Sequence, residues 1–141
     1  MFKKIFKKEN KKNNYGENIL ITALLIHAAK IDDKYTNVEK EIIKKALISL
    51  NAITPNDAEE LLKKAEKKEQ ESNQIVAFTR EIKKNSMEFR LKIIEILWKI
   101  VYSDGSSDSH ESNLIRRVCG LLYISDRDSG IIKLKVKNSL K

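Results

Sequence analysis

The sequence predicts an all-α fold class: a single compact helical domain of about seven core helices with an internal pseudo-two-fold repeat, plus a short basic N-terminal amphipathic segment. One proline and four glycines among 141 residues leave little room for the turns of an all-β fold. Charged residues make up 34% of the chain, and apolar residues recur between them at helical spacing. A chain of this length buries a core as one domain without a disulfide or a structural metal.

Several of the predicted helices begin at recognisable signals. In Thr54-Pro55 the threonine is an N-cap and the proline occupies the first turn, where its missing N–H is not needed. The first helix is expected over about residues 18–31, after a polar linker at residues 10–16. The later helices are predicted to begin after Thr36, after Thr54, at Ile75, after Ser86, after Asp108 and at Ser125-Asp126.

A short acidic pattern occurs twice. Asp32 is followed seven residues later by Glu39, and Asp104 is followed seven residues later by Glu111, so the two copies have the same internal spacing. Each copy follows an apolar stretch and precedes a stretch of Ile or Leu with basic residues. Two similar helix–acidic loop–helix units predict a duplicated, pseudo-symmetric core.

Helix capping explains part of this repeat. Thr36 and Glu39 have the spacing of a capping box, in which each side chain accepts a hydrogen bond from the other residue's backbone N–H. Asp108 and Glu111 have the same spacing with a stronger N-cap acceptor. A cap stabilises by about 0.5–2 kcal/mol, which accounts for these four residues without a ligand.

Asp32 and Asp104 have two explanations. Each follows the predicted end of a helix, where the helix dipole makes a carboxylate unfavourable by about 0.3–1 kcal/mol. Either the side chain accepts hydrogen bonds in an Asx turn, or a cation shared with Glu39 or Glu111 holds it. Oxygen ligands suit Ca²⁺ or Mg²⁺ better than Zn²⁺, although neither loop matches the EF-hand consensus. The candidate metal ligands are Asp32, Glu39, Asp104 and Glu111.

The net charge of +8 is concentrated at the two ends of the chain. Six lysines and one glutamate give residues 1–12 a charge of +5, and four lysines give residues 133–141 a charge of +4. This leaves −1 for residues 13–132. A near-neutral body argues against a nucleic-acid-binding face.

The N-terminal segment is amphipathic. Phe2, Ile5 and Phe6 would share one face of a helix whose other face is basic. Lysines contribute about 1 kcal/mol each near an anionic leaflet, which favours reversible, salt-dependent membrane contact. The alternatives are a disordered, solubilising tail and a short helix docked on the domain. The candidate membrane-contact residues are Phe2, Lys3, Lys4, Ile5, Phe6, Lys7 and Lys8.

No enzymatic activity is indicated. The chain has no glycine-rich phosphate-binding motif, no GxSxG and no Cys/His pair. His110-Glu111 is not a zincin motif, because Leu114 stands where the second histidine is needed. We therefore expect no small-molecule substrate and no cofactor other than a divalent cation.

Two further residues are predicted to be structural. His27 lies on an apolar helix face and is expected to be a packed core histidine, and Cys119 is expected to be a small buried hydrophobe. No apolar run is long enough for a membrane span, and the N-terminus lacks the features of a signal peptide. The expected location is the cytoplasm, with peripheral contact at the inner face of the membrane.

The same stretches resemble a known family. ALLIHAAKIDD (residues 23–33), with Glu39, is similar to the first half of TerB-like tellurite-resistance domains. LWKIVYSDG (97–105), with Glu111 and RRV (116–118), is similar to the second half. LLYISDRD (121–128) resembles the family's closing segment, so the resemblance covers roughly residues 17–132.

The resemblance implies a helical domain over residues 17–141, preceded by a basic amphipathic segment and linker over residues 1–16. It also implies a bacterial stress or metal-resistance system, often near membranes, and acidic positions that have been proposed to bind metal. Those positions match Asp32, Glu39, Asp104 and Glu111. The chain departs from the family pattern at Asp33, where glycine is usual, and in its basic tails.

Two functions follow as hypotheses. The first is a non-catalytic TerB-like module that senses a divalent cation through its two acidic loops or docks a partner in a stress response. The second is a membrane-surface adaptor whose helical body binds another protein and whose acidic loops are only helix caps.

Overall fold

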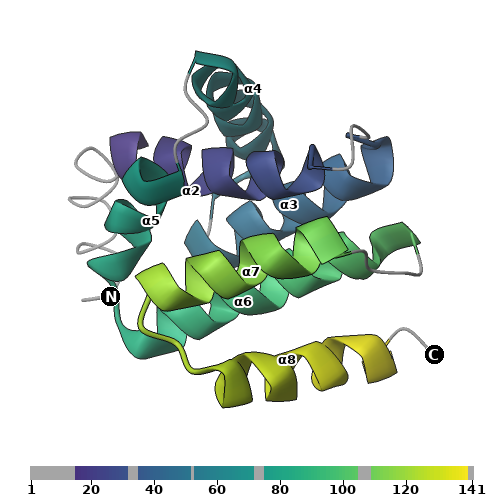
Figure 1. Cartoon of the computed structure of the whole chain (residues 1–141). Coiled ribbons are helices and arrows are strands. Elements are labelled where there is room, and N and C mark those ends of the chain that lie inside the picture. The colour runs from purple at the N-terminus through teal and green to yellow at the C-terminus, as the bar shows by residue number, and fades with distance from the viewer. Residues whose placement is uncertain (1–14, 32–34, 52, 72–74, 105–108, 140–141) are drawn as a thin grey trace, which may run out of the picture.

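The computed structural model describes residues 15–31, 35–51, 53–71, 75–104 and 109–139, and their side chains except those of residues 15–17, 51, 104 and 109–111. These residues form seven α-helices and a short 3₁₀ helix, with no strand among them, which confirms the predicted fold class (Figure 1). The helices are α2 (Tyr15–Ala29), α3 (Asn37–Asn51), α4 (Pro55–Glu71), α5 (Ile75–Lys83), α6 (Met87–Val101), η1 (Tyr102–Asp104), α7 (Ser109–Leu121) and α8 (Asp126–Ser139).

Side-chain caps fix where four of these helices begin. At each start, a Ser or Thr hydroxyl accepts a hydrogen bond from the backbone N–H three residues later, at 3.1–3.2 Å. Each bond satisfies one of the N–H groups that have no partner within the helix. The capping residues are Thr36 for α3, Thr54 for α4, Ser86 for α6 and Ser125 for α8.

The central helix is α2. Ala23, Leu24, Leu25 and Ile26 are all 0% exposed, so over this stretch the helix has no face toward solvent. It packs against α3, α4, α5 and α6. The helix begins at Tyr15, so the prediction that residues 15 and 16 belong to a linker was wrong. The apolar residues that indicated a helix begin only after these two residues, so their periodicity could not predict the first turn of α2.

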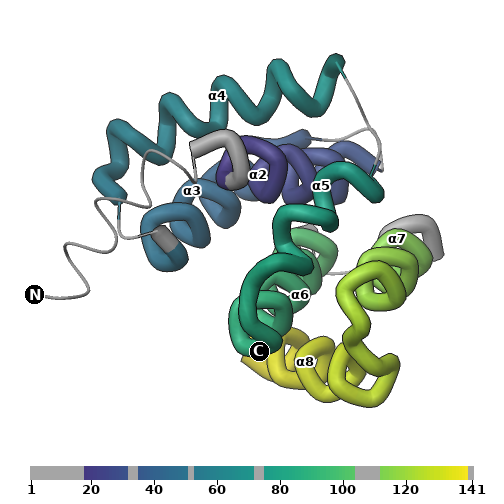
Figure 2. The backbone as a smooth tube through the Cα atoms, turned by 90° about the vertical axis from the view of Figure 1, so that its left-hand side faces the viewer, coloured from purple at the N-terminus to yellow at the C-terminus, as the bar shows by residue number. Residues whose placement is uncertain are grey.

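The predicted duplication is visible in the helix boundaries. Helix α6 begins and ends at the positions of α2 moved along the chain by the offset between Asp32 and Asp104, and α7 begins at the same offset from α3. Helix α8 begins a single position earlier than this offset from α4 would place it. Helices α2, α3 and α4 pack against one another, as do α6, α7 and α8. Figure 2 shows these two triplets around α5, with α4 and α8 on opposite sides of the molecule.

Helix α8 is joined to α6 by a buried hydrogen bond. The indole N–H of Trp98 donates to the Ser129 hydroxyl at 3.2 Å, and the Lys133 ammonium lies 5.1 Å from the Trp98 ring centroid. A buried indole needs such a partner, because an unpaired polar group in the core is destabilising. Within the described ranges, no helix combines the length and apolar character needed to cross a bilayer.

Candidate functional site

The two acidic connections leave the same end of the molecule. In Figure 1, α2 ends and α3 begins at the right-hand side, and η1 ends on that side as well. Helix α3 packs against both α2 and α6. The fold therefore brings the two copies of the acidic pattern to one end of the helical bundle.

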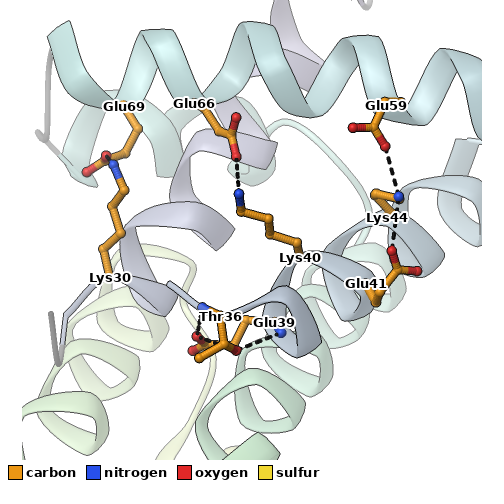
Figure 3. A network of polar contacts seen from close by, with 9 residues as sticks. All are labelled: Lys30, Thr36, Glu39, Lys40, Glu41, Lys44, Glu59, Glu66 and Glu69. Carbon is orange, nitrogen blue, oxygen red and sulfur yellow. Dashed lines mark hydrogen bonds and ion pairs between the residues drawn. The ribbon is translucent and has the colours of Figure 1, made fainter. Parts of the chain in front are cut away.

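Glu39 is buried and caps its own helix. The residue is only 4% exposed, although its side chain ends in a carboxylate. The Thr36 N–H donates to Glu39 Oε1 at 2.8 Å and the Thr36 hydroxyl lies 3.0 Å from the same oxygen (Figure 3). In return, the Glu39 N–H donates to Thr36 Oγ1 at 3.1 Å. The predicted capping box at the start of α3 is confirmed.

The other three candidate ligands are placed only in part. Asp104 is the last residue of η1, and Glu111 lies in the first turn of α7. The side chains of both, and all of Asp32, lie outside the described residues. Among the side chains that are described, no three His, Cys, Asp or Glu residues form a group that could hold a metal ion. The metal site remains a prediction.

The candidate membrane-contact residues, 2–8, also lie outside the described residues. Their contact with a membrane is therefore untested. The C-terminal basic segment is different, because α8 includes residues 133–139. This part of the basic segment is therefore helical.

A polar network that the sequence did not predict joins α2 and α3 to α4. Lys30 Nζ lies 2.8 Å from Glu69 Oε1, and His27 Nδ1 lies 3.3 Å from Glu69 Oε2. Glu69 is buried. It lies 39 residues beyond Lys30 in the sequence, so no short-range spacing indicates that the two side chains form a pair. His27 is only partly buried, so it is an ion-pair or hydrogen-bond partner at the edge of the core and not a fully packed core residue.

Helix α3 contributes two more cations to this network. Lys40 Nζ lies 3.8 Å from Glu66 Oε2, and Lys44 Nζ lies 2.8 Å from Glu59 and 3.0 Å from Glu41 (Figure 3). Glu59 and Glu66 are two turns apart on one face of α4, which aligns them with α3. Because these pairs are partly exposed, each contributes little to the stability of the protein.

Tyr35 lies at the end of the acidic connection that enters α3. The Lys40 ammonium is 4.8 Å from its ring centroid and that of Lys30 is 5.9 Å away. Its hydroxyl oxygen is buried without a well-aligned hydrogen-bond partner among the described residues, although the Glu66 carboxylate is near enough to act on it. Burial, followed by the Glu66 carboxylate, raises the pKa of Tyr35 well above its usual range, so the phenol stays neutral.

Comparison with known proteins gives one match. The family model described as tellurite resistance protein TerB matches residues 18–134, which run from α2 into α8 and include both acidic connections. No curated protein and no solved structure matches the chain.

Proposed function

The chain belongs to the family of the tellurite resistance protein TerB, and from that premise we propose that it is a non-catalytic module that binds a divalent cation at its acidic end. The observation that carries the proposal is the convergence of the two acidic connections on one end of the bundle (Figure 1). Because four helices of the chain separate them, only the fold brings them to the same side.

The ligands of the proposed site are the carboxylates of Asp32, Glu39, Asp104 and Glu111. Carboxylate oxygens without thiolates favour Ca²⁺ or Mg²⁺ over Zn²⁺. The two hydrogen-bond contacts from Thr36 to Glu39 Oε1 hold that carboxylate in one orientation, as outer-shell partners do in known metal sites. The cation would then offset the repulsion between carboxylates and the unfavourable helix dipoles near Asp32 and Asp104.

Thermal unfolding in millimolar Ca²⁺, Mg²⁺, Mn²⁺ or Zn²⁺ tests the proposal. A cation at a hundred times its dissociation constant stabilises the folded state by about 2.7 kcal/mol, and the melting temperature rises accordingly. We expect Ca²⁺ or Mg²⁺ to give the largest rise, and the Asp32→Asn/Asp104→Asn variant to lose it. The matched control is Asp126→Asn/Asp128→Asn, which removes two exposed carboxylates in the first turn of α8.

An unchanged melting temperature of the wild-type protein in millimolar Ca²⁺, Mg²⁺ and Mn²⁺ would show that no such site exists. In that case the Asp32→Asn/Asp104→Asn variant should be as stable as the wild type or slightly more stable. Asparagine keeps the turn hydrogen bond and removes the charge that opposes the helix dipole.

The second candidate function is a protein-interaction adaptor at a membrane surface, acting in the cytoplasm. The capping box favours it, because reciprocal hydrogen bonds with Thr36 account for the Glu39 carboxylate without a cation. Residues 1–12 would supply the membrane contact and the helical body the contact with another protein. We expect the full chain to co-sediment with anionic but not neutral vesicles, less at high salt and not after deletion of residues 1–12. Equal pelleting of full-length and truncated protein would contradict this function.

A further inference from the structure

A groove with an apolar floor runs between α3, α6 and α8, with a cavity volume of about 700 Å³. Figure 2 shows α6 flanked by α3 on one side and α8 on another. On α6 the groove extends from Glu88 to Lys99, so it follows about three helical turns, or about 16 Å. Its apolar lining consists of Ile42, Ala46, Leu50, Leu91, Ile96 and Ile132.

The rim of the groove is basic. Four exposed lysines surround two glutamates, and Glu95 is already paired with Lys99 at 3.4 Å and Lys135 at 3.0 Å. The groove runs along α6 as far as Lys99 in its last turn, but its lining includes none of the four proposed cation ligands. It is therefore separate from the proposed cation site. The four lysines are Lys45, Lys92, Lys99 and Lys135.

The internal repeat shows what kind of element covers such a surface. Helices α3 and α6 correspond to α7 and α2 in the repeat. Helix α5 packs against α7 and α2, and Figure 2 shows it between them. Its buried side chains have the spacing i, i+3, i+4, i+7. In one half of the molecule, an amphipathic helix thus covers the counterparts of two of the three groove helices, α3 and α6. Those side chains are Ile75, Phe78, Thr79 and Ile82.

The segment before α2 has the same spacing as α5. Phe2, Ile5, Phe6 and Glu9 have the same i, i+3, i+4, i+7 spacing as the four buried residues of α5, at an offset a single residue longer than that between Asp32 and Asp104, and Glu9 stands where α5 has Ile82. Helix α5 directly precedes α6, and this segment directly precedes α2, the counterpart of α6. Figure 1 shows α2 and α6 starting at the same end of the molecule, and the groove begins at Glu88 in the first turn of α6.

We propose that residues 2–10 form a helix that occupies the groove between α3, α6 and α8, as α5 occupies the corresponding position in the other half. Phe2, Ile5 and Phe6 would contact the apolar floor. Residues 11–14 would connect this helix to α2, with a reach of about 13 Å when extended. The inference does not depend on a bound cation. It places Phe2, Ile5 and Phe6 in the groove, so docking competes with the membrane contact of the second proposed function, which uses the same side chains.

The charges of the segment agree with this orientation. On a helix, Lys4 and Lys7 lie opposite Ile5 and Phe6, so docking leaves these two ammonium groups in water and away from the lysine rim. Glu9 is the one acidic residue of the segment, and it shares the face of Ile5 and Phe6. It would therefore meet the basic rim of the groove.

Methyl NMR on the full chain tests the docking. We expect Ile5→Asn/Phe6→Asn to shift the methyl resonances of Ile42, Leu91 and Ile132, which line the groove, and to leave Leu61 in α4 unchanged. The matched control, Lys4→Asn/Lys7→Asn, changes the opposite face of the segment and should leave the methyl resonances of all four residues near their wild-type positions. Wild-type groove resonances in the Ile5→Asn/Phe6→Asn variant would overturn the proposal.

Disulfide trapping provides an independent readout. Phe6→Cys with Ala46→Cys should crosslink within one chain at least about tenfold faster than Phe6→Cys with Lys67→Cys, because docking raises the effective concentration of the first pair. Lys67 is exposed on α4, away from the groove, and the native Cys119 is buried in both variants. Equal crosslinking rates would count against docking.

Two further outcomes would assign the groove to another occupant and overturn the proposal. If the groove resonances depend on protein concentration, a second copy of the chain binds there. If they respond to an added acidic amphipathic peptide but not to the Ile5→Asn/Phe6→Asn change, the groove binds a partner helix. The NMR and crosslinking samples contain no lipid and no divalent cation, so they test docking separately from membrane contact and cation binding. Docking can therefore fail while the other two are observed, or be observed while the other two fail.

Discussion

Tyr123 shows how a single residue ends a helix at an energetic cost. Its φ of 58° is left-handed, and it is the non-glycine residue with positive φ in the described part of the chain. The Ile124 N–H donates to the Cys119 carbonyl at 2.9 Å and the Tyr123 N–H to the Gly120 carbonyl at 3.4 Å. This is the hydrogen-bond pattern of a Schellman motif, with Tyr123 at the position where glycine is preferred.

We predict that Tyr123→Gly stabilises the protein. Glycine adopts the left-handed conformation without the cost of about 1–2 kcal/mol that a side chain brings. The change also removes the exposed contact with Lys83, whose ammonium is 3.0 Å from the phenol oxygen, so the expected net gain is about 0.5–1 kcal/mol. Urea unfolding measures the difference. Tyr123→Ala is the control, since it loses the same contact and keeps the strain, and a glycine variant no more stable than the alanine variant would disprove the explanation.

At the scale of helices, the local sequence specified where elements begin but not how they pair. Thr36, Thr54, Ser86 and Ser125 each cap the helix that the sequence assigned to them. A cap depends on residues three positions apart, so it can be predicted from spacing alone. The bond between Trp98 and Ser129 spans 31 residues, and nothing in either local pattern indicates it.

We predict that Ser129→Ala destabilises the packing of α8 on α6. The substitution leaves the buried Trp98 N–H without an acceptor, which costs about 1–3 kcal/mol. A double-mutant cycle with Trp98→Phe, followed by urea unfolding, isolates this bond from the lost ring area. We expect a coupling of about 1 kcal/mol between the two positions, and additive effects would show that the hydrogen bond contributes nothing.

The ion pairs of Glu95, with Lys135 on α8 and with Lys99 on its own helix, predict a pH dependence. The hydrogen bond from Lys135, aided by its charge and that of Lys99, lowers the pKa of Glu95 against the opposing effect of partial burial. A carboxylate whose pKa is lowered by folding stabilises the protein above its unfolded pKa, and this stability is lost as the pH falls through the folded value. Both lysines are largely exposed, so the contribution is below about 1 kcal/mol.

We therefore expect Glu95→Gln to reduce the loss of stability between about pH 5 and pH 3, as measured by urea midpoints at several pH values. Glu88→Gln is the matched control on the same helix, because the Glu88 side chain is 84% exposed and its oxygen is 3.9 Å from Lys92. The same acid dependence in Glu95→Gln and wild type would rule out this contribution.

At the scale of the whole molecule, the core follows the predicted pattern and the candidate site does so only in part. Cys119 is 1% exposed, as its apolar neighbours indicated. Glu39 forms the predicted cap, because that interaction lies within one turn. A shared ligand set needs two loops to meet across the fold, and spacing within each loop does not determine that distance. The Glu69 contacts with Lys30 and His27 were missed for the same reason.

Burial of Cys119 predicts a thiol that reports on opening of the whole domain. Burial raises the pKa of the thiol, so little thiolate is present near neutral pH. We expect a thiol reagent to label the folded chain at least about a hundredfold more slowly than the urea-unfolded chain, since labelling requires α7 and α8 to open. Ile131→Cys, at an exposed position of α8, is the control that should label rapidly in the folded state. Comparable rates for Cys119 and that control would contradict the prediction.

The central position of α2 has a consequence for protein synthesis. The middle of this helix is buried by α3, α4, α5 and α6, yet the helix leaves the ribosome before any of them. At about 5–20 residues per second, the stretch from the end of α2 to the end of α6 takes about 4–15 s to translate. Until α6 is complete, α2 lacks part of the packing that later removes Leu24 and Leu25 from water. The yield of folded protein in a cell should therefore follow chaperone capacity more closely than the stability of the finished domain.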